Sequence, residues 1–118
     1  MKIEARASHG VVILDIEGRM TVEADRLVSI ADLVRDLLRE GRRHFLVNLE
    51  GVSSLDTTGV RDIVEAYVTS TRQDGSLKLL KLPARVRDVL TVTRLLTVLE
   101  SFDREAEAVA SFGAMASN

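Results

Sequence analysis

The segment Asp56-Thr57-Thr58-Gly59 places two hydroxyl side chains directly after a carboxylate, a combination that suits two kinds of chemistry. Aspartate and threonine are preferred at helix N-caps, where a side-chain oxygen accepts a hydrogen bond from the free amides of the first turn. The same helix end carries a positive partial charge and tolerates an attached phosphate. A threonine hydroxyl there could accept a phosphoryl group, which adds about −1.5 to −2 charges. From these residues alone, the segment is either a cap or a modification site.

Other residue types that carry chemistry are sparse. The chain has no cysteine, which excludes a disulfide framework, a zinc-thiolate site and a cysteine nucleophile. His9 and His44 are far apart and lack a nearby carboxylate pattern, so neither a metal site nor a catalytic pair is indicated. Glycine-rich nucleotide-binding motifs are absent from the sequence. We therefore expect a protein that is not an enzyme and needs no cofactor; an enzyme would need a pocket with convergent ionisable groups.

The length and charge of the chain further restrict the class of protein it can be. The 118 residues suit one domain, predicted over 1–112 with a flexible tail over 113–118. With 16 basic and 18 acidic residues, the chain lacks the basic excess of a nucleic-acid binder. The apolar run over 11–14 stops at Asp15, far short of a membrane span, and the start of the chain has no signal-peptide pattern. We expect a cytoplasmic protein without membrane insertion.

The N-terminal half must position this segment through two strands, a helix and a third strand. Alternating apolar residues from Ile3 to Ala7, a turn at Ser8-His9-Gly10 and a strand from Val11 that ends at Gly18 predict a hairpin. From about residue 24 the spacing of the apolar residues becomes that of a helix, and Gly41 is expected to end this helix. Its apolar stripe is Leu27, Ile30, Ala31, Val34, Leu37 and Leu38. A buried strand is predicted over 44–49.

The C-terminal half continues the alternation of helices and strands. A helix after Gly59 should turn Val60, Ile63, Val64, Tyr67 and Val68 inward and end before Asp74. A strand over 77–82 follows, then a short helix near Pro83, whose fixed φ suits a helix start. A last strand is expected over 97–102. Asp103 could cap a final helix with Ala106, Val109, Ala110 and Phe112 inside.

The predicted order is β-β-α-β-α-β-α-β-α. Strands joined through helices lie parallel, so we predict an α/β fold with a mostly parallel β-sheet, an N-terminal hairpin and about four helices. Functional loops in such sheets cluster at the carboxyl ends of the strands. This rule directs attention to the loops after residues 18, 49 and 82.

Around the Asp56 segment the chain resembles the STAS family of sulphate transporters and anti-sigma-factor antagonists. The family motif, Asp-Ser-Ser/Thr-Gly and an apolar residue, stands here as Asp56-Thr57-Thr58-Gly59-Val60, and the strand before it reads Asn48-Leu49-Glu50-Gly51-Val52. The likeness covers nearly the whole chain and includes the strand ending at Gly18 and the closing helix. The resemblance implies a STAS-like fold.

The resemblance also implies a binding switch. In stand-alone members, the residue after the motif aspartate is phosphorylated by a serine/threonine kinase that is also the anti-sigma factor, and that position is Thr57. The unphosphorylated antagonist would bind the kinase and free a sigma factor. The implied partner surface is Asp56, Thr57, Thr58, Gly59, Val60, Thr21 and Glu23. A homodimer is a further option.

Three departures from the family pattern concern the partner more than the fold. Thr57 replaces the serine usual in antagonists, and Thr21 stands where an acidic residue is common, so Glu23 or Asp25 could supply the carboxylate. Arg94 replaces a glycine near the end of the third helix. The alternative function is a scaffold or regulatory STAS subunit of the stressosome-like or lipid-transport-associated kind.

Overall fold

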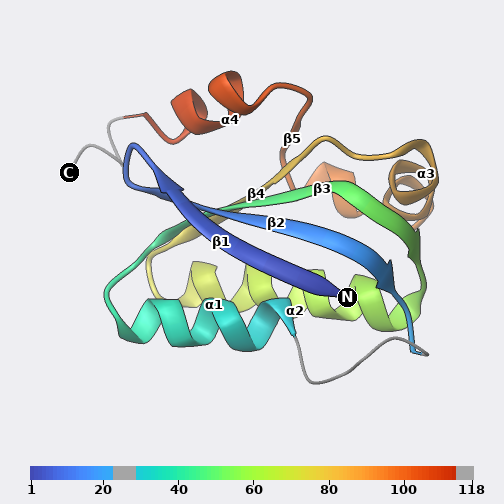
Figure 1. Ribbon diagram of the computed structural model, residues 1–118, viewed down its shortest axis with the longest axis horizontal. Helices are drawn as coiled ribbons and strands as arrows, with labels where there is room; N and C mark the ends of the chain where they lie inside the picture. Colours follow the sequence, from blue (N-terminus) through green and yellow to red (C-terminus); the bar gives the residue numbers. More distant parts are fainter. Residues whose placement is uncertain (23–28, 114–118) are drawn as a thin grey trace.

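The computed structural model of the chain describes residues 1–22 and 29–113 (Figure 1). The strands are β1 (Lys2–Ser8), β2 (Val11–Met20), β3 (His44–Leu55), β4 (Ser76–Leu80) and β5 (Ser101–Phe102). The helices are α1 (Ile30–Arg39), α2 (Thr57–Arg72), α3 (Ala84–Val92) and α4 (Glu105–Ser111), with a 3-10 turn over Leu95–Thr97. This order confirms the predicted alternation of elements.

The described strands form one sheet in the order β1-β2-β3-β4-β5. β1 pairs antiparallel with β2 through the hairpin, and the other neighbours pair in parallel. The α/β fold class and the mostly parallel sheet are therefore confirmed. Since β2, β3 and β4 run in the same direction, their carboxyl ends lie at one edge of the sheet, where the functional loops of such folds gather.

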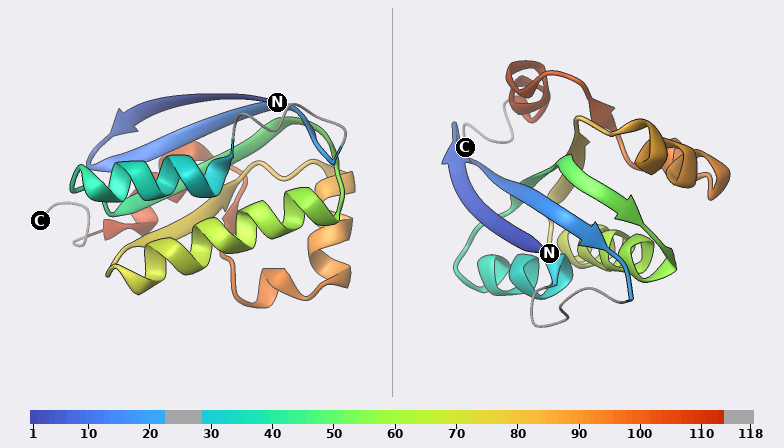
Figure 2. Two further views of the ribbon diagram at one scale, coloured as in Figure 1. Left: turned by 90° about the horizontal axis from the view of Figure 1, so that it is seen from below. Right: turned by 45° about the vertical axis from the view of Figure 1, so that its right-hand side comes forward.

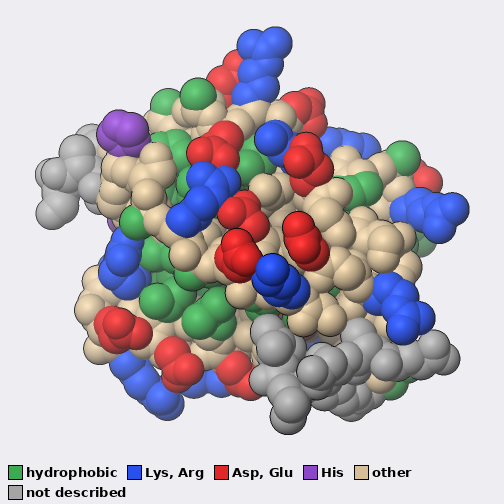
Figure 3. Space-filling view, in the orientation of Figure 1, with side chains coloured by type: hydrophobic (Ala, Val, Ile, Leu, Met, Phe, Trp, Pro, Cys, Tyr) green, Lys and Arg blue, Asp and Glu red, His purple; other side chains and the backbone are tan. Residues whose placement is uncertain are grey.

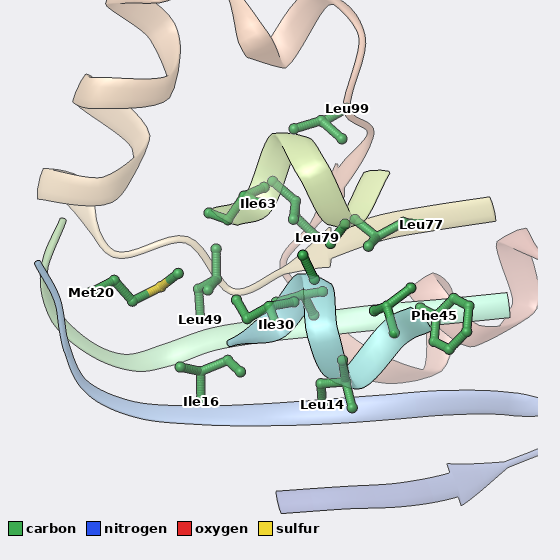
Figure 4. Close-up of a cluster of buried hydrophobic side chains, with 14 of the residues drawn as sticks. Leu14, Ile16, Met20, Ile30, Phe45, Leu49, Ile63, Leu77, Leu79 and Leu99 are labelled. Carbon is green, nitrogen blue, oxygen red and sulfur yellow. The ribbon is translucent and has the colours of Figure 1, made fainter. Parts of the chain in front are cut away.

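Helices cover both faces of this sheet. α1 and α2 lie side by side on one face, and α4 covers part of the other (Figures 1 and 2). The larger buried cluster fills the space between the sheet and the helix pair, with side chains such as Leu14, Phe45 and Ile63 (Figure 4). A smaller cluster lies under α4 and includes Ile13, Leu46 and Phe112.

The central strands run further than their apolar patterns predicted. β2 ends at Met20 rather than Gly18, and β3 ends at Leu55 rather than residue 49. The two strands stay paired as far as the partners Met20 and Leu55, with shifts of register along the way. A Cβ on Gly51 would lie 2.7 Å from the Ile16 carbonyl oxygen, so glycine permits this close pairing. The expected loop over 50–55 is therefore strand.

The first helix begins later than predicted, and the second helix buries a different set of residues. α1 begins at Ile30 with Ser29 as its N-cap, not near residue 24, and Leu27 lies outside the described residues. The residues of α2 that are fully buried are Gly59, Ile63, Ala66 and Ser70, whereas Val60, Val64, Tyr67 and Val68 are half-buried. The small residues face inward because α2 packs closely against α1 and the sheet.

The C-terminal third holds the other corrections. β4 ends at Leu80 rather than residue 82 because Lys81 has a φ of 54°, which breaks the extended backbone. The strand expected over 97–102 is reduced to Ser101–Phe102, since Arg94, at a φ of 61°, turns the chain into the 3-10 segment.

The closing helix has a different cap from the predicted one, and only two of the four residues predicted inside, Val109 and Phe112, pack against the sheet. Arg104, not Asp103, is the N-cap of α4, and its side chain makes no capping bond. Ala108 and Phe112 are buried, whereas Ala106 and Ala110 are exposed. A helix that starts at Glu105 turns this face toward the sheet. No helix in the described part of the chain is long and apolar enough to cross a membrane.

Candidate functional site

The candidate site is the start of α2, where the capping residue is Asp56. Asp56 is extended, with φ −117° and ψ −170°, and Thr57 is the first helical residue. One carboxylate oxygen of Asp56 accepts hydrogen bonds from the amides of Thr58, at 2.9 Å, and Gly59, at 3.3 Å. The sequence left three N-cap residues open, and the structure selects Asp56. Its negative charge also complements the helix dipole.

Asp56 also joins the ends of two strands. Its second carboxylate oxygen accepts a hydrogen bond from the Val22 amide at 2.8 Å, and its own amide donates to the Met20 carbonyl oxygen at 3.2 Å. The turn after β2 and the start of α2 are thus held together by one residue. This arrangement follows from the parallel pairing of β2 with β3, which brings Met20 beside Leu55.

Thr57 and Thr58 are both exposed at this helix start. Within the described residues, neither threonine hydroxyl makes a hydrogen bond. The exposed Thr57 hydroxyl meets the geometric requirement of a modification site: another protein can reach it without unfolding the helix. Val60 is half-buried, and its amide donates to the Asp56 carbonyl oxygen at 3.0 Å.

Gly59 has a role inside the chain. A Cβ at this position would overlap the Met20 carbonyl oxygen and Leu55 Cδ1, and would lie 2.7 Å from Met20 Cβ. Glycine therefore lets the first turn of α2 pack against the end of β2. The group that lies closest to Gly59 is thus Met20 of the same chain.

The structure brings Thr21 to the same edge of the sheet as Asp56 because it follows Met20 directly. The hydroxyl oxygen of Thr21 is buried and has no hydrogen-bond partner among the described residues. Glu23 and Asp25, the candidates for the missing carboxylate, lie outside the described residues.

Asp62, on the second turn of α2, is a structural residue that sequence reasoning missed. Its carboxylate accepts hydrogen bonds from the amides of Ile30, at 2.8 Å, and Ala31, at 2.9 Å. These are free amides at the start of α1, so one helix caps the other. The pair is separated by about thirty residues in the chain, and no local spacing signals it.

A second polar cluster lies on the α4 face of the sheet. Arg6 binds Asp15 through Nε at 2.6 Å and Glu105 through Nη1 at 3.0 Å, and Asn48 donates to Asp15 at 2.8 Å. Hydrogen bonding to Arg6 lowers the pKa of both carboxyl groups from their ordinary values. This cluster links β1 and β2 to the start of α4, and we assign it to stability.

The two histidines have local contacts. His9 Nδ1 lies 3.1 Å from Ser8 Oγ, and His44 Nδ1 lies 2.9 Å from Ser76 Oγ. His44 also stacks at a tilt on Phe112, with 5.8 Å between ring centroids. Among the residues that the structure describes, no group of three or more histidines or carboxylates could hold a metal ion.

The chain was compared with models of protein families. The model of the STAS domain matches residues 2–108. A comparison with curated proteins finds no match.

Solved structures with the same fold include an anti-sigma-factor antagonist (STAS) domain protein from Planctomyces limnophilus. It is 17% identical, with a TM-score of 0.79 over 94% of this chain and 97% of that one. The phosphorylated Bacillus cell fate determinant SpoIIAA is 18% identical, with a TM-score of 0.70 over 93% and 98% of the two chains. A sulfate transporter family protein from Wolinella succinogenes is 22% identical, with a TM-score of 0.69 over 86% and 84%. At these identities the likeness concerns the fold.

Proposed function

Because the chain belongs to the STAS domain family, we propose that it is an anti-sigma-factor antagonist whose partner binding is switched by phosphorylation of Thr57. The partner is a cytoplasmic anti-sigma factor that is also a serine/threonine kinase. The chain itself acts as a binding module and not as an enzyme. The observation that carries this proposal is the exposed Thr57 hydroxyl on the first residue of α2.

The proposed modification is a simple group transfer. The Thr57 hydroxyl loses its proton to the kinase and forms a bond to the γ-phosphorus of ATP, and ADP leaves. The positive end of α2 favours the phosphate, and the first turn of this helix holds no acidic residue besides the Asp56 cap. The amides of Thr58 and Gly59 already bind Asp56, so the phosphate would extend toward solvent and the partner.

The proposed switch is electrostatic. The partner surface consists of the exposed Thr57 and Thr58 and the half-buried Asp56, Val60 and Thr21, and the buried Gly59 lets this helix start pack against Met20. A phosphate on Thr57 would stand next to the Asp56 carboxylate, at the centre of this surface. Binding would then have to remove water from two adjacent anions, which costs several kcal/mol without compensating partners. Phosphorylation therefore releases the kinase, and the kinase recaptures its sigma factor.

The proposal is tested by incubating the protein with anti-sigma-factor kinases, Mg²⁺ and ATP, and mapping the phosphate by mass spectrometry. We expect one phosphate, on Thr57. The matched control is Thr58→Ala, which removes the adjacent exposed hydroxyl and should still accept one phosphate, on Thr57. Thr57→Ala should accept no phosphate and should stay bound to the kinase.

Affinity measurements complete the test. Thr57→Asp should weaken kinase binding by about tenfold or more, because it places a second carboxylate beside Asp56. A phosphate on Thr58 instead of Thr57 would contradict the assignment of the residue. Equal function of wild type and Thr57→Ala within a large stable assembly would favour the scaffold role.

A further inference from the structure

β1 is the outer strand of the sheet, and its outer edge is unpaired within the described residues. Figure 2 shows this strand along one margin of the molecule, with no other strand beyond it. The strand is seven residues long, whereas β5 at the opposite margin has two. A long open edge presents a row of amide and carbonyl groups that another strand can pair with.

The hairpin decides which backbone groups of β1 point outward. His9 and Gly10 form a two-residue turn with φ of 50° and 81°, so Ser8 and Val11 are the hydrogen-bonded pair that closes it. Hydrogen-bonded pairs then recur at every second residue of β1, which directs the even-numbered residues toward β2. The outward groups therefore belong to Ile3, Ala5 and Ala7.

The sequence of β1 is complementary to itself about Ala5. In an antiparallel pair of two copies centred there, Ile3 meets Ala7 and Glu4 meets Arg6 of the second copy. A centre at Glu4 would instead place Lys2 against Arg6 and Glu4 against itself, and like charges directly opposite destabilise a strand pair. Of these two registers, only the one centred on Ala5 places opposite charges across from each other while the outward amide and carbonyl groups form hydrogen bonds.

Both charged side chains are accessible for such pairing. The side chain of Glu4 is 68% exposed and that of Arg6 is 43% exposed, although Glu4 also pairs with Lys2 and Arg6 with carboxylates of its own chain. Figure 3 shows acidic and basic side chains along the front of the molecule where β1 lies, and hydrophobic side chains between β1 and α1. The accessible apolar residues of these two elements are Ile3, Ala5, Ala7, Leu33 and Leu37.

We propose that β1 pairs antiparallel with β1 of a second copy of this chain, with the two-fold axis at Ala5. Six backbone hydrogen bonds would form, two for each of the three pairs made by Ile3, Ala5 and Ala7, by the geometry of antiparallel strands. The result is one continuous sheet across a symmetric dimer, in which the same surface is used on both sides. The apolar strip beside α1 lies along this junction.

Cysteine crosslinking tests the register directly, since the chain has no cysteine of its own. In the proposed dimer the two Ala5 Cα atoms are about 5.5 Å apart, within the range of a disulfide. The two Ala7 Cα atoms are about 14 Å apart, beyond that range. Under mild oxidation, Ala5→Cys should give a covalent dimer, and the matched control Ala7→Cys should stay monomeric on a non-reducing gel. Equal crosslinking of both variants, or of neither, would overturn the proposal.

Sedimentation of the full chain over about 1 μM to 1 mM gives the dissociation constant independently. Glu4→Lys should raise it by about tenfold or more, because two favourable charge pairs become repulsive. The control Glu65→Lys makes the same change on the exposed face of α2 and should leave it unaltered. Circular dichroism would verify that both variants fold. A wild type that stays monomeric over the whole range, or a dimer indifferent to Glu4→Lys, would contradict the assigned surface.

Discussion

The Ser29 hydroxyl donates a hydrogen bond to the Asp62 carboxylate at 2.8 Å, and through this contact the second turn of α2 holds the beginning of α1. The same carboxylate accepts the amides of Ile30 and Ala31. Ser29 is itself the local cap, since its oxygen accepts from the Asp32 amide at 3.2 Å. The start of α1 is thus capped twice, once from its own sequence and once from its neighbour.

Replacing Asp62 should therefore destabilise the fold. Asp62→Ala would leave the amides of Ile30 and Ala31 without their acceptor, at a cost of about 1–3 kcal/mol in the free energy of unfolding. Urea unfolding followed by circular dichroism measures this loss. Asp88→Ala, at an exposed position of α3, is the control and should change little. An unchanged urea midpoint for Asp62→Ala would show that the contacts contribute nothing.

Gly59 should tolerate no side chain. In Gly59→Ala the new methyl group would overlap the Met20 carbonyl oxygen, which is backbone and cannot rotate away. We expect a loss of about 1–3 kcal/mol, typical of overpacking, seen as a lower melting temperature by calorimetry. Thr58→Ala, one residue earlier and exposed, should melt close to the wild type. A Gly59→Ala variant as stable as the wild type would argue against the close packing of α2 on β2.

The ion pairs of Arg6 with Asp15 and Glu105 should make the free energy of unfolding depend on pH below about 4.5. The pKa values of Asp15 and Glu105 lie below their ordinary values of 3.8 and 4.5, first because of hydrogen bonds from Arg6. A depressed pKa in the folded state stabilises the protein above the unfolded-state pKa. That stabilisation is lost as the pH falls from about 4.5 and through the lower folded-state values.

Urea unfolding at a series of pH values between about 7 and 3 would measure this dependence. Asp15→Asn should be less stable than the wild type at neutral pH, and the difference should shrink as the pH falls. Glu107→Gln, on the exposed side of α4, is the matched control. A difference for Asp15→Asn that stays constant down to pH 3 would exclude the ion pair as its origin.

The sequence predicted those helices and strands whose apolar residues follow the regular spacing of that element. The hairpin follows from alternation and a turn signal, and the start of α2 follows from a run of capping residues. The choice of Asp56 among three candidates required the structure, because each of the three side chains can accept the same amides. Only the extended backbone of Asp56 decides between them.

The parts that were missed depend on contacts between distant segments. Gly51, Ser53 and Ser54 are turn-forming residues, yet pairing with β2 extends them into β3. Similarly, Asp62 reads as an ordinary surface carboxylate until α1 lies against α2. The left-handed backbone of Arg94, which shortens the last strand, is unexpected for a residue with a side chain.

The shortness of β5 has a consequence for how copies of this chain can associate. A sheet with a long unpaired edge strand on each side could pair with one molecule at each edge and grow into an open fibril, as cross-β aggregates do. Here a two-residue margin offers too few groups for a stable ladder. Association through β1, the opposite edge strand, would then stop at two molecules, so the fold itself limits polymerisation.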